Sequence, residues 1–428
     1  MKRLFVMALA VLLAFGSFGM LASAQEPIEL RVAWWGSQDR HNRTLAAIDL
    51  FEERYPHITV EAEFTGWSGY WERIASQAAG RNLPDVFQQD MQYLDMYHSR
   101  DLMVDMYQFV ESGVFDLTHV DESALVGGVL EGQLIAVNLG SNSLVGIYDP
   151  AIYAEAGVAE PTPDMTWNEW IESAYAIHEA TGLYAAGGFP GGPFHGFRHY
   201  LRQRGYTLYK EDGTGLAYDD NQLFIDYFSK EIELVDAGVL PGTDIRNEVT
   251  SVENELVIFG QAAMAWVHSN QIVAMDAVAQ RPLKMTLLPK DEEQIEEGQY
   301  LKPSQFFSIA STSSPAHQEA AAMFVDFFTN DLEANQILLA ERGVPISREV
   351  RAGLADDLTD VQQMMFDYID LVVDNSSPID PPEPAGHNEV NRLLDDLLDM
   401  MMFGAISVEN AAERFMTESN RILQAASQ

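Results

Sequence analysis

The N-terminal third of the chain alternates between two hydrophobic patterns. Apolar side chains recur at every second position in residues 28–34 and again in residues 58–64, which is the period of a β-strand. Between them, in residues 45–55, apolar side chains are three and four positions apart, which predicts a helix. A second helix is predicted from about Ser68, followed by a buried strand in residues 84–87. Strands that alternate with helices predict an α/β unit with a mostly parallel sheet.

Loops that follow the carboxyl ends of parallel strands are where such sheets bind ligands. Three segments satisfy this condition, and they supply the candidates Trp35, Ser37, His41, Trp67, Tyr70, Gln89 and Asp90. Two interpretations stay open for several of them. Trp35 and Trp67 each lie beside a glycine, and each is either a stacking platform or a core residue. Asp90 either accepts a hydroxyl group of a ligand or caps the next helix. Trp34 and Trp71 continue apolar faces and are expected in the core.

Small polar residues separate two apolar segments after this unit. Residues 134–137 and 144–148 are strand-like, and residues 138–143 between them are small and polar, which suits a hinge. Thr166 and Glu169 then have the spacing of a capping box, which predicts a helix start. Further helices are predicted in residues 222–237, 251–259, 318–328 and 332–339, and strands in residues 284–288 and 304–310. A Met and Leu stripe in residues 393–402 is expected to be core.

Length and charge narrow the class of protein. Single cores stop growing at about 250 to 300 residues, so a chain of 428 residues with 47% hydrophobic residues predicts two globular lobes. The formal net charge is −40, from 25 basic and 65 acidic residues. Such a surface repels nucleic acid and anionic membranes, so neither is expected as a partner.

The N-terminus has the pattern of a secretory signal peptide. Two basic residues precede an apolar run in residues 4–18, and Ala22-Ser23-Ala24 is a small-x-small cleavage site. Residues 1–24 are therefore expected to be removed, which leaves a net charge of −42 (23 basic against 65 acidic residues). The chain has no cysteine, which excludes disulfides and a lipid-modified N-terminal cysteine. We expect a periplasmic location, with free secretion as the alternative.

Several separated segments resemble one family, the extracellular solute-binding proteins of ABC importers, in the sugar-carrying branch that includes maltose-binding protein. The matching segments are FEERYPHITVEAEF, WSGYWERIASQAAGRNLPDVFQQD, GIYDPAIYAEAGVAEPTP with TWNEW, FGQAAMAW, SSPAHQEAAAMFVDFFT and RGVPIS. Each segment is weakly specific alone, but six in the family's order cover essentially the whole mature chain.

The resemblance implies a type II periplasmic-binding-protein fold, with two α/β lobes that close over a ligand and are joined by three hinge crossings. The crossings would fall near residues 140–142, 303–305 and 342–345. The first lobe would comprise residues 25–139 plus 306–341, and the second residues 143–302 plus 346–428. The hydrophobic pattern itself indicates the first and third crossings, and only the resemblance supplies the second.

The resemblance also implies candidate ligand contacts beyond those of the first unit. Asn142, Gln305 and Arg342 would reach the cleft from the crossings, and Trp266 and Asn270 from a loop of the second lobe. Amide side chains form paired hydrogen bonds with sugar hydroxyls, and aromatic faces stack on pyranose rings. We therefore expect a monomer that binds a carbohydrate and passes it to ABC permease subunits, without a cofactor.

A dense basic run in residues 195–204 permits two interpretations. Either its charges pair with surrounding carboxylates, or it faces the cleft and favours an acidic sugar such as a uronate. Non-sugar ligands such as a glycerol phosphodiester or a polyamine are the alternative within the same fold. A secreted glycoside hydrolase would need two carboxylates at a defined separation, but no G-x-S-x-G, HExxH, P-loop or G-x-G-x-x-G motif is present. The chain is therefore expected not to be an enzyme.

Overall fold

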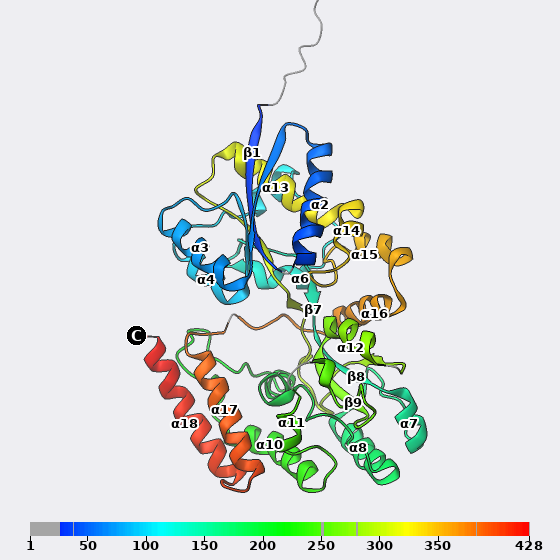
Figure 1. Cartoon of the computed structure of the whole chain (residues 1–428). Helices are drawn as coiled ribbons and strands as arrows, with labels where there is room; N and C mark the ends of the chain where they lie inside the picture. Colours follow the sequence, from blue (N-terminus) through cyan, green and yellow to red (C-terminus); the bar gives the residue numbers. More distant parts are fainter. Residues whose placement is uncertain (1–25, 37, 250–251, 280, 382, 428) are drawn as a thin grey trace, which may run out of the picture.

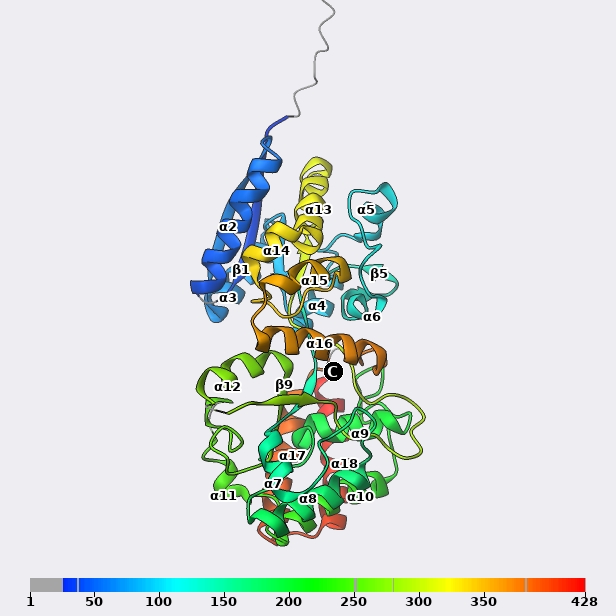
Figure 2. The same ribbon diagram turned by 90° about the vertical axis from the view of Figure 1, so that its right-hand side faces the viewer.

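The computed structural model describes residues 26–36, 38–249, 252–279, 281–381 and 383–427. Two lobes lie one above the other and are joined by extended segments (Figure 1). The same division is visible after a quarter turn, with α16 (Asp360–Asp374) beside the junction (Figure 2). The expected signal peptide and the candidate Ser37 lie outside the described residues.

The first lobe is built on a mixed five-stranded sheet. Its strands, in spatial order, are β2 (Ile58–Thr65), β1 (Ile28–Trp35), β3 (Val86–Gln89), β12 (Phe306–Ile309) and β6 (Val137–Asn138). β1 is parallel to both β2 and β3, whereas β12 is antiparallel to β3 and β6. The helices of this lobe are α2 (Gln38–Arg54), α3 (Trp67–Ala79), α4 (Met91–His98), α5 (Tyr107–Ser112), α6 (Glu122–Leu125), α13 (Pro315–Asn330) and α14 (Leu332–Leu338). A small hairpin of β4 (Val129–Leu130) and β5 (Gln133–Leu134) completes it.

Helices cover both faces of this sheet, as strand alternation requires. Val32 and Trp34 of β1 belong to one core cluster with Phe51 of α2 and Phe324 of α13. The neighbouring residues Ala33 and Trp35 point to the opposite face, where Ile74 of α3 and Leu94 of α4 cover them. The predicted strand and helix alternation of the first unit is thus confirmed.

The second lobe has a smaller, antiparallel sheet and more helices. Its strand order is β10 (Lys284–Thr286), β8 (Leu144–Tyr148) and β9 (Met264–His268). The helices are α7 (Pro150–Ala156), α8 (Trp167–Thr181), α9 (Phe197–Gln203), α10 (Asn221–Asp236), α11 (Thr243–Arg246), α12 (Ile272–Val278), α16, α17 (His387–Met402) and α18 (Val408–Ala426). The predicted capping box at Thr166 is present, and the Met and Leu stripe of α17 is buried in the core.

One predicted helix, in residues 251–259, is wrong. Apart from the undescribed Ser251, the segment forms a short 3₁₀ turn at Val252–Asn254 and then successive turns. Its backbone bonds span three residues, as from the Ile258 amide to the Glu255 carbonyl at 3.0 Å. Val257 and Ile258 are both buried against the second sheet, so tertiary packing outweighs the helical spacing.

Three segments connect the lobes and lie side by side. β7 (Ser141–Asn142) pairs with β11 (Lys302–Pro303), and Ser141 also forms a bridge with Val344. The Ser141 amide donates to the Val344 carbonyl at 2.8 Å. The α/β fold with three hinge crossings therefore matches the expectation.

Helix α15 (Arg348–Leu354), expected in the second lobe, contacts both lobes. Val350 and Leu354 lie in the core cluster of the second sheet. On its other side, Arg348 and Arg351 form ion pairs with Asp121 of the first lobe at 2.8 and 3.1 Å. The chain after residue 346 is therefore held by both lobes before it enters α16.

In the described parts of the chain, no helix combines the length and apolar character that a membrane span requires.

A buried carboxyl group in the second lobe predicts a pH effect on stability. Burial raises the pKa of Glu255 from 4.5 to about 7. Because this pKa is raised in the folded protein, the neutral carboxyl group contributes its full stability below pH 4.5. This contribution is lost as the pH rises through 7. Glu255→Gln should therefore stabilise the protein relative to wild type at pH 8, by up to about 3 kcal/mol, and much less at pH 4.5. Urea unfolding of both proteins at the two pH values measures this, and an equal difference at both would contradict it.

Candidate ligand-binding cleft

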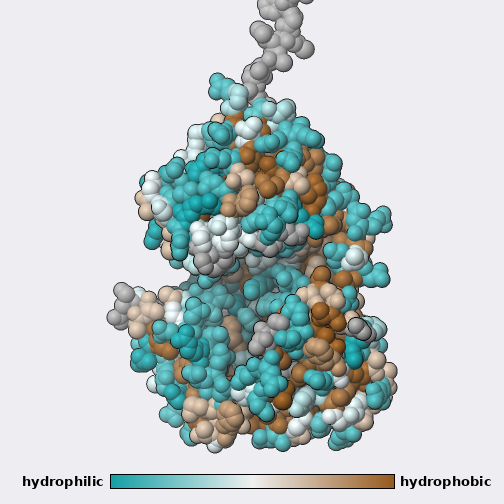
Figure 3. All heavy atoms as spheres, in the orientation of Figure 1, coloured by the Kyte–Doolittle hydropathy of each residue, from teal (hydrophilic) through white to brown (hydrophobic). Residues whose placement is uncertain are grey.

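Two adjoining pockets lie between the lobes, where the space-filling view shows a hollow with a largely hydrophilic wall (Figure 3). The smaller one, the hinge pocket, has a volume of about 320 Å³. It is lined by Arg40, Asn142, His268, Asn270, Gln271, Lys302, Pro303, Ser304, Gln305, Glu341 and Arg342. The larger one, the wide pocket, has a volume of about 1060 Å³, and its lining includes residues 90–92, 95, 96, 129–131, 207–213, 379–381 and 383–388. Residues 302–304 line both, so the two pockets meet along β11.

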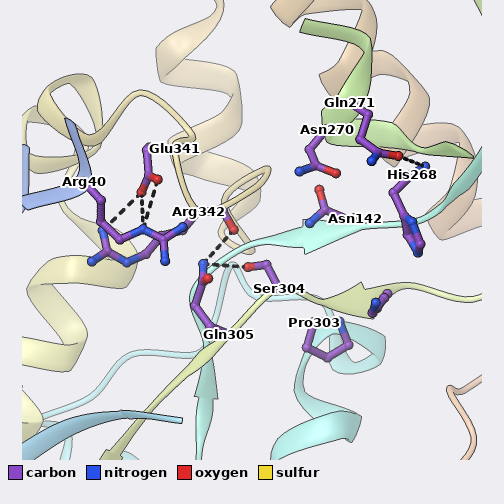
Figure 4. Close-up of a pocket in the computed structure, with 11 residues that line it drawn as sticks. Arg40, Asn142, His268, Asn270, Gln271, Pro303, Ser304, Gln305, Glu341 and Arg342 are labelled. Carbon is purple, nitrogen blue, oxygen red and sulfur yellow. Dashed lines mark hydrogen bonds and ion pairs between the residues drawn. The ribbon is translucent and has the colours of Figure 1, made fainter. Parts of the chain in front are cut away.

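All three crossings contribute to the hinge pocket, and amide groups converge there. Asn142 of β7 is 8% exposed, and its Oδ1 is buried without a hydrogen-bond partner. Asn270 is exposed at the entrance to α12, and its side chain faces that of Asn142 (Figure 4). Gln305 donates from Nε2 to the carbonyl of Arg342 at 3.0 Å. The structure thus brings together four residues predicted from the sequence, namely Asn142, Asn270, Gln305 and Arg342.

Arg342 lines the hinge pocket but is anchored within the first lobe. It donates to Thr44 Oγ1 at 2.9 Å and to Gln88 Oε1 at 3.3 Å, and its guanidinium lies over the Phe328 ring. Burial lowers its pKa, and the nearby Arg40 lowers it further. Arg40 in turn pairs with Glu341 at 2.7 Å (Figure 4). Arg342 therefore positions the third crossing and contributes positive charge to the pocket.

The aromatic candidates of the first lobe lie in its interior. Trp35 is 8% exposed and packs against the rings of Tyr70 and Trp71, with centroids 5.1 and 5.4 Å away. Tyr70 is fully buried, and its hydroxyl donates to the Gln88 carbonyl. Tyr70 therefore lies in the core, because its helix turns it under the sheet, and direct ligand contact by it stays a prediction. Trp35 keeps only a small exposed edge. Nothing is described of the Trp67 side chain.

Three further candidates line neither pocket. His41 is buried, and its Nδ1 accepts from Trp34 Nε1 at 3.1 Å; burial lowers its pKa. Gln89 is fully buried, and both of its amide atoms lack partners. Trp266 packs edge to face on Trp170, with centroids 5.8 Å apart, inside the second lobe. His41 and Gln89 are thus buried in the first lobe and Trp266 is partly buried in the second, and direct ligand contact by the three stays a prediction.

Asp90 caps a helix, as one interpretation predicted, and it also lies at the cleft, where hydrogen bonding to a ligand stays a prediction. Its carboxylate accepts from the Gln92 amide and caps α4, and the residue lines the wide pocket. Burial raises its pKa. Helix capping therefore orients this carboxylate at the cleft wall.

The basic run pairs with carboxylates, as one interpretation predicted, and part of it also faces the cleft. Arg198 contacts Asp380 at 2.6 Å and Glu383 at 3.1 Å, and Arg202 also pairs with Asp380. Arg204 pairs with Asp291. His195 and Arg198 are among the residues that line the wide pocket.

Sequence reasoning missed several residues of the cleft. Tyr209 lies in the wide pocket, with its hydroxyl 3.0 Å from His387 Nδ1, and Lys302 lies where the two pockets meet. Lys302 directly precedes the crossing expected near residues 303–305, and this position could have identified it. Tyr209 follows no periodic pattern that could have identified it.

Among the described residues, no group of three or more histidine, aspartate or glutamate side chains is arranged to hold a metal ion.

Comparison with known structures shows likeness over most of the chain. A family 1 extracellular solute-binding protein from Alicyclobacillus acidocaldarius subsp. acidocaldarius DSM 446 is 27% identical, with a TM-score of 0.85. The match covers 94% of this chain and 100% of that one. A periplasmic oligogalacturonide-binding protein from Yersinia enterocolitica, in complex with saturated digalacturonic acid, is 25% identical, with a TM-score of 0.70 and the same two coverages.

The fold extends to more distant proteins. A cyclic α-maltosyl-1,6-maltose-binding protein from Arthrobacter globiformis is 18% identical, with a TM-score of 0.70, and covers 93% of this chain and 100% of its own. At that identity, the likeness shows the fold alone. The family model of bacterial extracellular solute-binding proteins matches residues 39–333. That range begins in α2 of the first lobe, includes the crossing into the second lobe and the return from it, and ends in α14 of the first lobe. The chain therefore belongs to the bacterial extracellular solute-binding proteins.

Proposed function

We propose that this protein captures a carbohydrate between its two lobes in the periplasm and delivers it to an ABC permease. The observation that carries the proposal is the convergence of amide side chains from the crossings and the second lobe on one polar pocket. Asn142 presents a buried oxygen without a partner, which a ligand hydroxyl can satisfy. A solved structure at 25% identity, that of a periplasmic oligogalacturonide-binding protein in complex with saturated digalacturonic acid, supports this ligand class.

The geometry of the cleft suits binding of a ligand that is not chemically changed. Residues of both lobes line the wide pocket, from Asp90 in the first to His387 in the second. A ligand that contacts both lobes favours the closed arrangement by its differential affinity. Affinity in the micromolar range corresponds to about 8 kcal/mol, which paired hydrogen bonds and one or two ring contacts can supply.

A thermal-shift screen followed by calorimetry tests the proposal. The panel contains neutral and acidic mono- and oligosaccharides, with spermidine and a glycerol phosphodiester as non-sugar ligands. We expect a saccharide to raise the melting temperature and to be recovered intact by chromatography. Stabilisation only by a non-sugar ligand, or hydrolysis of the saccharide, would overturn the proposal.

Asn142→Leu is expected to weaken binding of the best saccharide by about 10- to 100-fold. The substitution keeps a side chain that branches at Cγ but removes the unpaired oxygen, and a lost hydrogen bond to a buried group costs about 1–3 kcal/mol. Asn168→Leu is the matched control, because Asn168 is exposed on α8 of the second lobe. Calorimetric titration of both variants and wild type measures the effect, and equal affinities in all three would contradict the site.

A further inference from the structure

The point where the two pockets meet carries unpaired hydrogen-bonding groups. His268 lines the hinge pocket and His195 the wide pocket, and their rings lie edge to face with centroids 5.6 Å apart. Lys302 lines both pockets. Each of the three comes from a different segment, namely β9, the turn before α9 and β11.

The hydrogen bonds of His268 determine which ring nitrogen carries the proton. Its side chain accepts a hydrogen bond from the backbone amide of Gln271. Nε2 has no partner in the described part of the protein, so the accepting atom is Nδ1. The neutral ring therefore carries its proton on Nε2. That N–H is a buried donor without an acceptor.

His195 and Lys302 complete the cluster. Nδ1 of His195 is also buried without a partner. Within the described residues, the Lys302 ammonium has no ion pair. Burial lowers the pKa of His195 to about 3 and that of His268 to about 4, and the nearby charge of Lys302 contributes to both shifts. A buried donor and a nearby unpaired cation call for an acceptor that carries negative charge.

The surrounding charges favour an anion here, in spite of the acidic chain. The hinge pocket is lined by three cations, Arg40, Lys302 and Arg342, and one carboxylate, Glu341, a formal charge of +2. In the wide pocket, Asp380 and Glu383 are already paired with Arg198. The remaining wide-pocket carboxylates, Asp90, Asp95, Glu131, Glu211 and Asp212, favour neutral hydroxyl groups there.

We propose that the ligand is an acidic sugar whose carboxylate binds at Lys302 and accepts from His268 Nε2, while its neutral rings extend into the wide pocket. This inference rests on the proposed function and adds the class of sugar. The carboxylate pairs with the unpaired ammonium, and its second oxygen satisfies the buried N–H. Hydroxyl groups of the rings donate to carboxylates such as Asp90.

Pairs of ligands that differ in the carboxylate charge test whether binding requires that charge. Short oligomers of galacturonate, glucuronate and mannuronate are titrated by calorimetry, each beside its methyl ester, which keeps the ring but removes the charge. We expect at least one free acid to bind 10-fold or more tightly than its ester, and to weaken as NaCl is raised.

Variants at Lys302 then test whether this residue causes the preference for the acid over its ester. Lys302→Met should weaken binding of the acid by about 10- to 100-fold and change binding of the ester less than 3-fold, and Lys302→Arg should restore most of the difference. The backbone pairing of β11 is retained in both, and their melting temperatures verify folding. Lys230→Gln on α10, outside both pockets, is the control.

The outcomes separate the two proposals. Neutral sugars that bind as tightly as the acids, or equal loss for acid and ester in Lys302→Met, would overturn this inference and leave carbohydrate capture intact. Binding of none of the saccharides would overturn both.

Discussion

Gly140→Ala is expected to destabilise the protein by about 1–3 kcal/mol and to weaken ligand binding at least 10-fold. A Cβ at this position would lie 2.5 Å from the carbonyl oxygen and 2.8 Å from the carbonyl carbon of Arg342. Both are backbone atoms of the third crossing, so a side-chain rotation cannot relieve the contact. The first and third crossings would have to separate, and the hinge pocket lies between them.

The same substitution at Gly80 provides the control. Gly80 ends α3 with an ordinary φ of −81°, and its added Cβ would meet nothing closer than 3.6 Å. Gly80→Ala should therefore change stability by less than about 1 kcal/mol. Urea unfolding and calorimetry measure both properties. Wild-type affinity and stability in Gly140→Ala would show that the crossings do not define the site.

Arg246→Met is expected to cost about 3–5 kcal/mol of stability, because it leaves a buried charge unpaired. Glu231 of α10 is 0% exposed, and its carboxylate contacts Arg246 of α11 at 2.6 Å. The second Glu231 oxygen already lacks a partner, so little else can compensate the lost cation. Replacing both residues, as Arg246→Met with Glu231→Leu, should recover much of the loss.

An exposed ion pair supplies the comparison for this prediction. Arg414 and Glu418 pair at 2.8 Å on the surface of α18. Arg414→Met should cost less than about 1 kcal/mol. Denaturant unfolding of the three variants gives the ranking, and similar losses for Arg246→Met and Arg414→Met would contradict the role given to burial.

The hydrophobic pattern predicted helices and strands well where the buried residues repeat with the period of a single kind of element, either a strand or a helix. β1 has strand alternation and is covered on both faces, and α17 has one apolar stripe and packs into the core. The pattern failed in residues 252–259, where adjacent buried residues can occupy turns as readily as a helix. Periodicity reports which side chains are buried, but it does not specify the hydrogen bonds of a short irregular segment.

The candidate site was predicted in part. Asn142 and Arg342, which line the hinge pocket, lie at the two crossings that the residue pattern indicates, whereas the crossing that contains Gln305 was supplied only by the family resemblance. The burial of Tyr70 was not predicted, because a residue near a loop in sequence can still point under the sheet. Residues 207–213, 379–381 and 383–386 line the cleft as irregular segments, whose paths cannot be predicted from a hydrophobic period.

The central claim, ligand capture between two closing lobes, is tested most directly by a distance across the cleft. Because the chain contains no cysteine, spin labels can be attached uniquely at Ser76→Cys on α3 and Gln424→Cys on α18, both exposed. The two helices lie in different lobes on the same side of the molecule (Figure 1). We expect the label separation to shorten when the best saccharide is added, with a midpoint at its calorimetric Kd. An unchanged distance distribution at saturating saccharide would contradict the account.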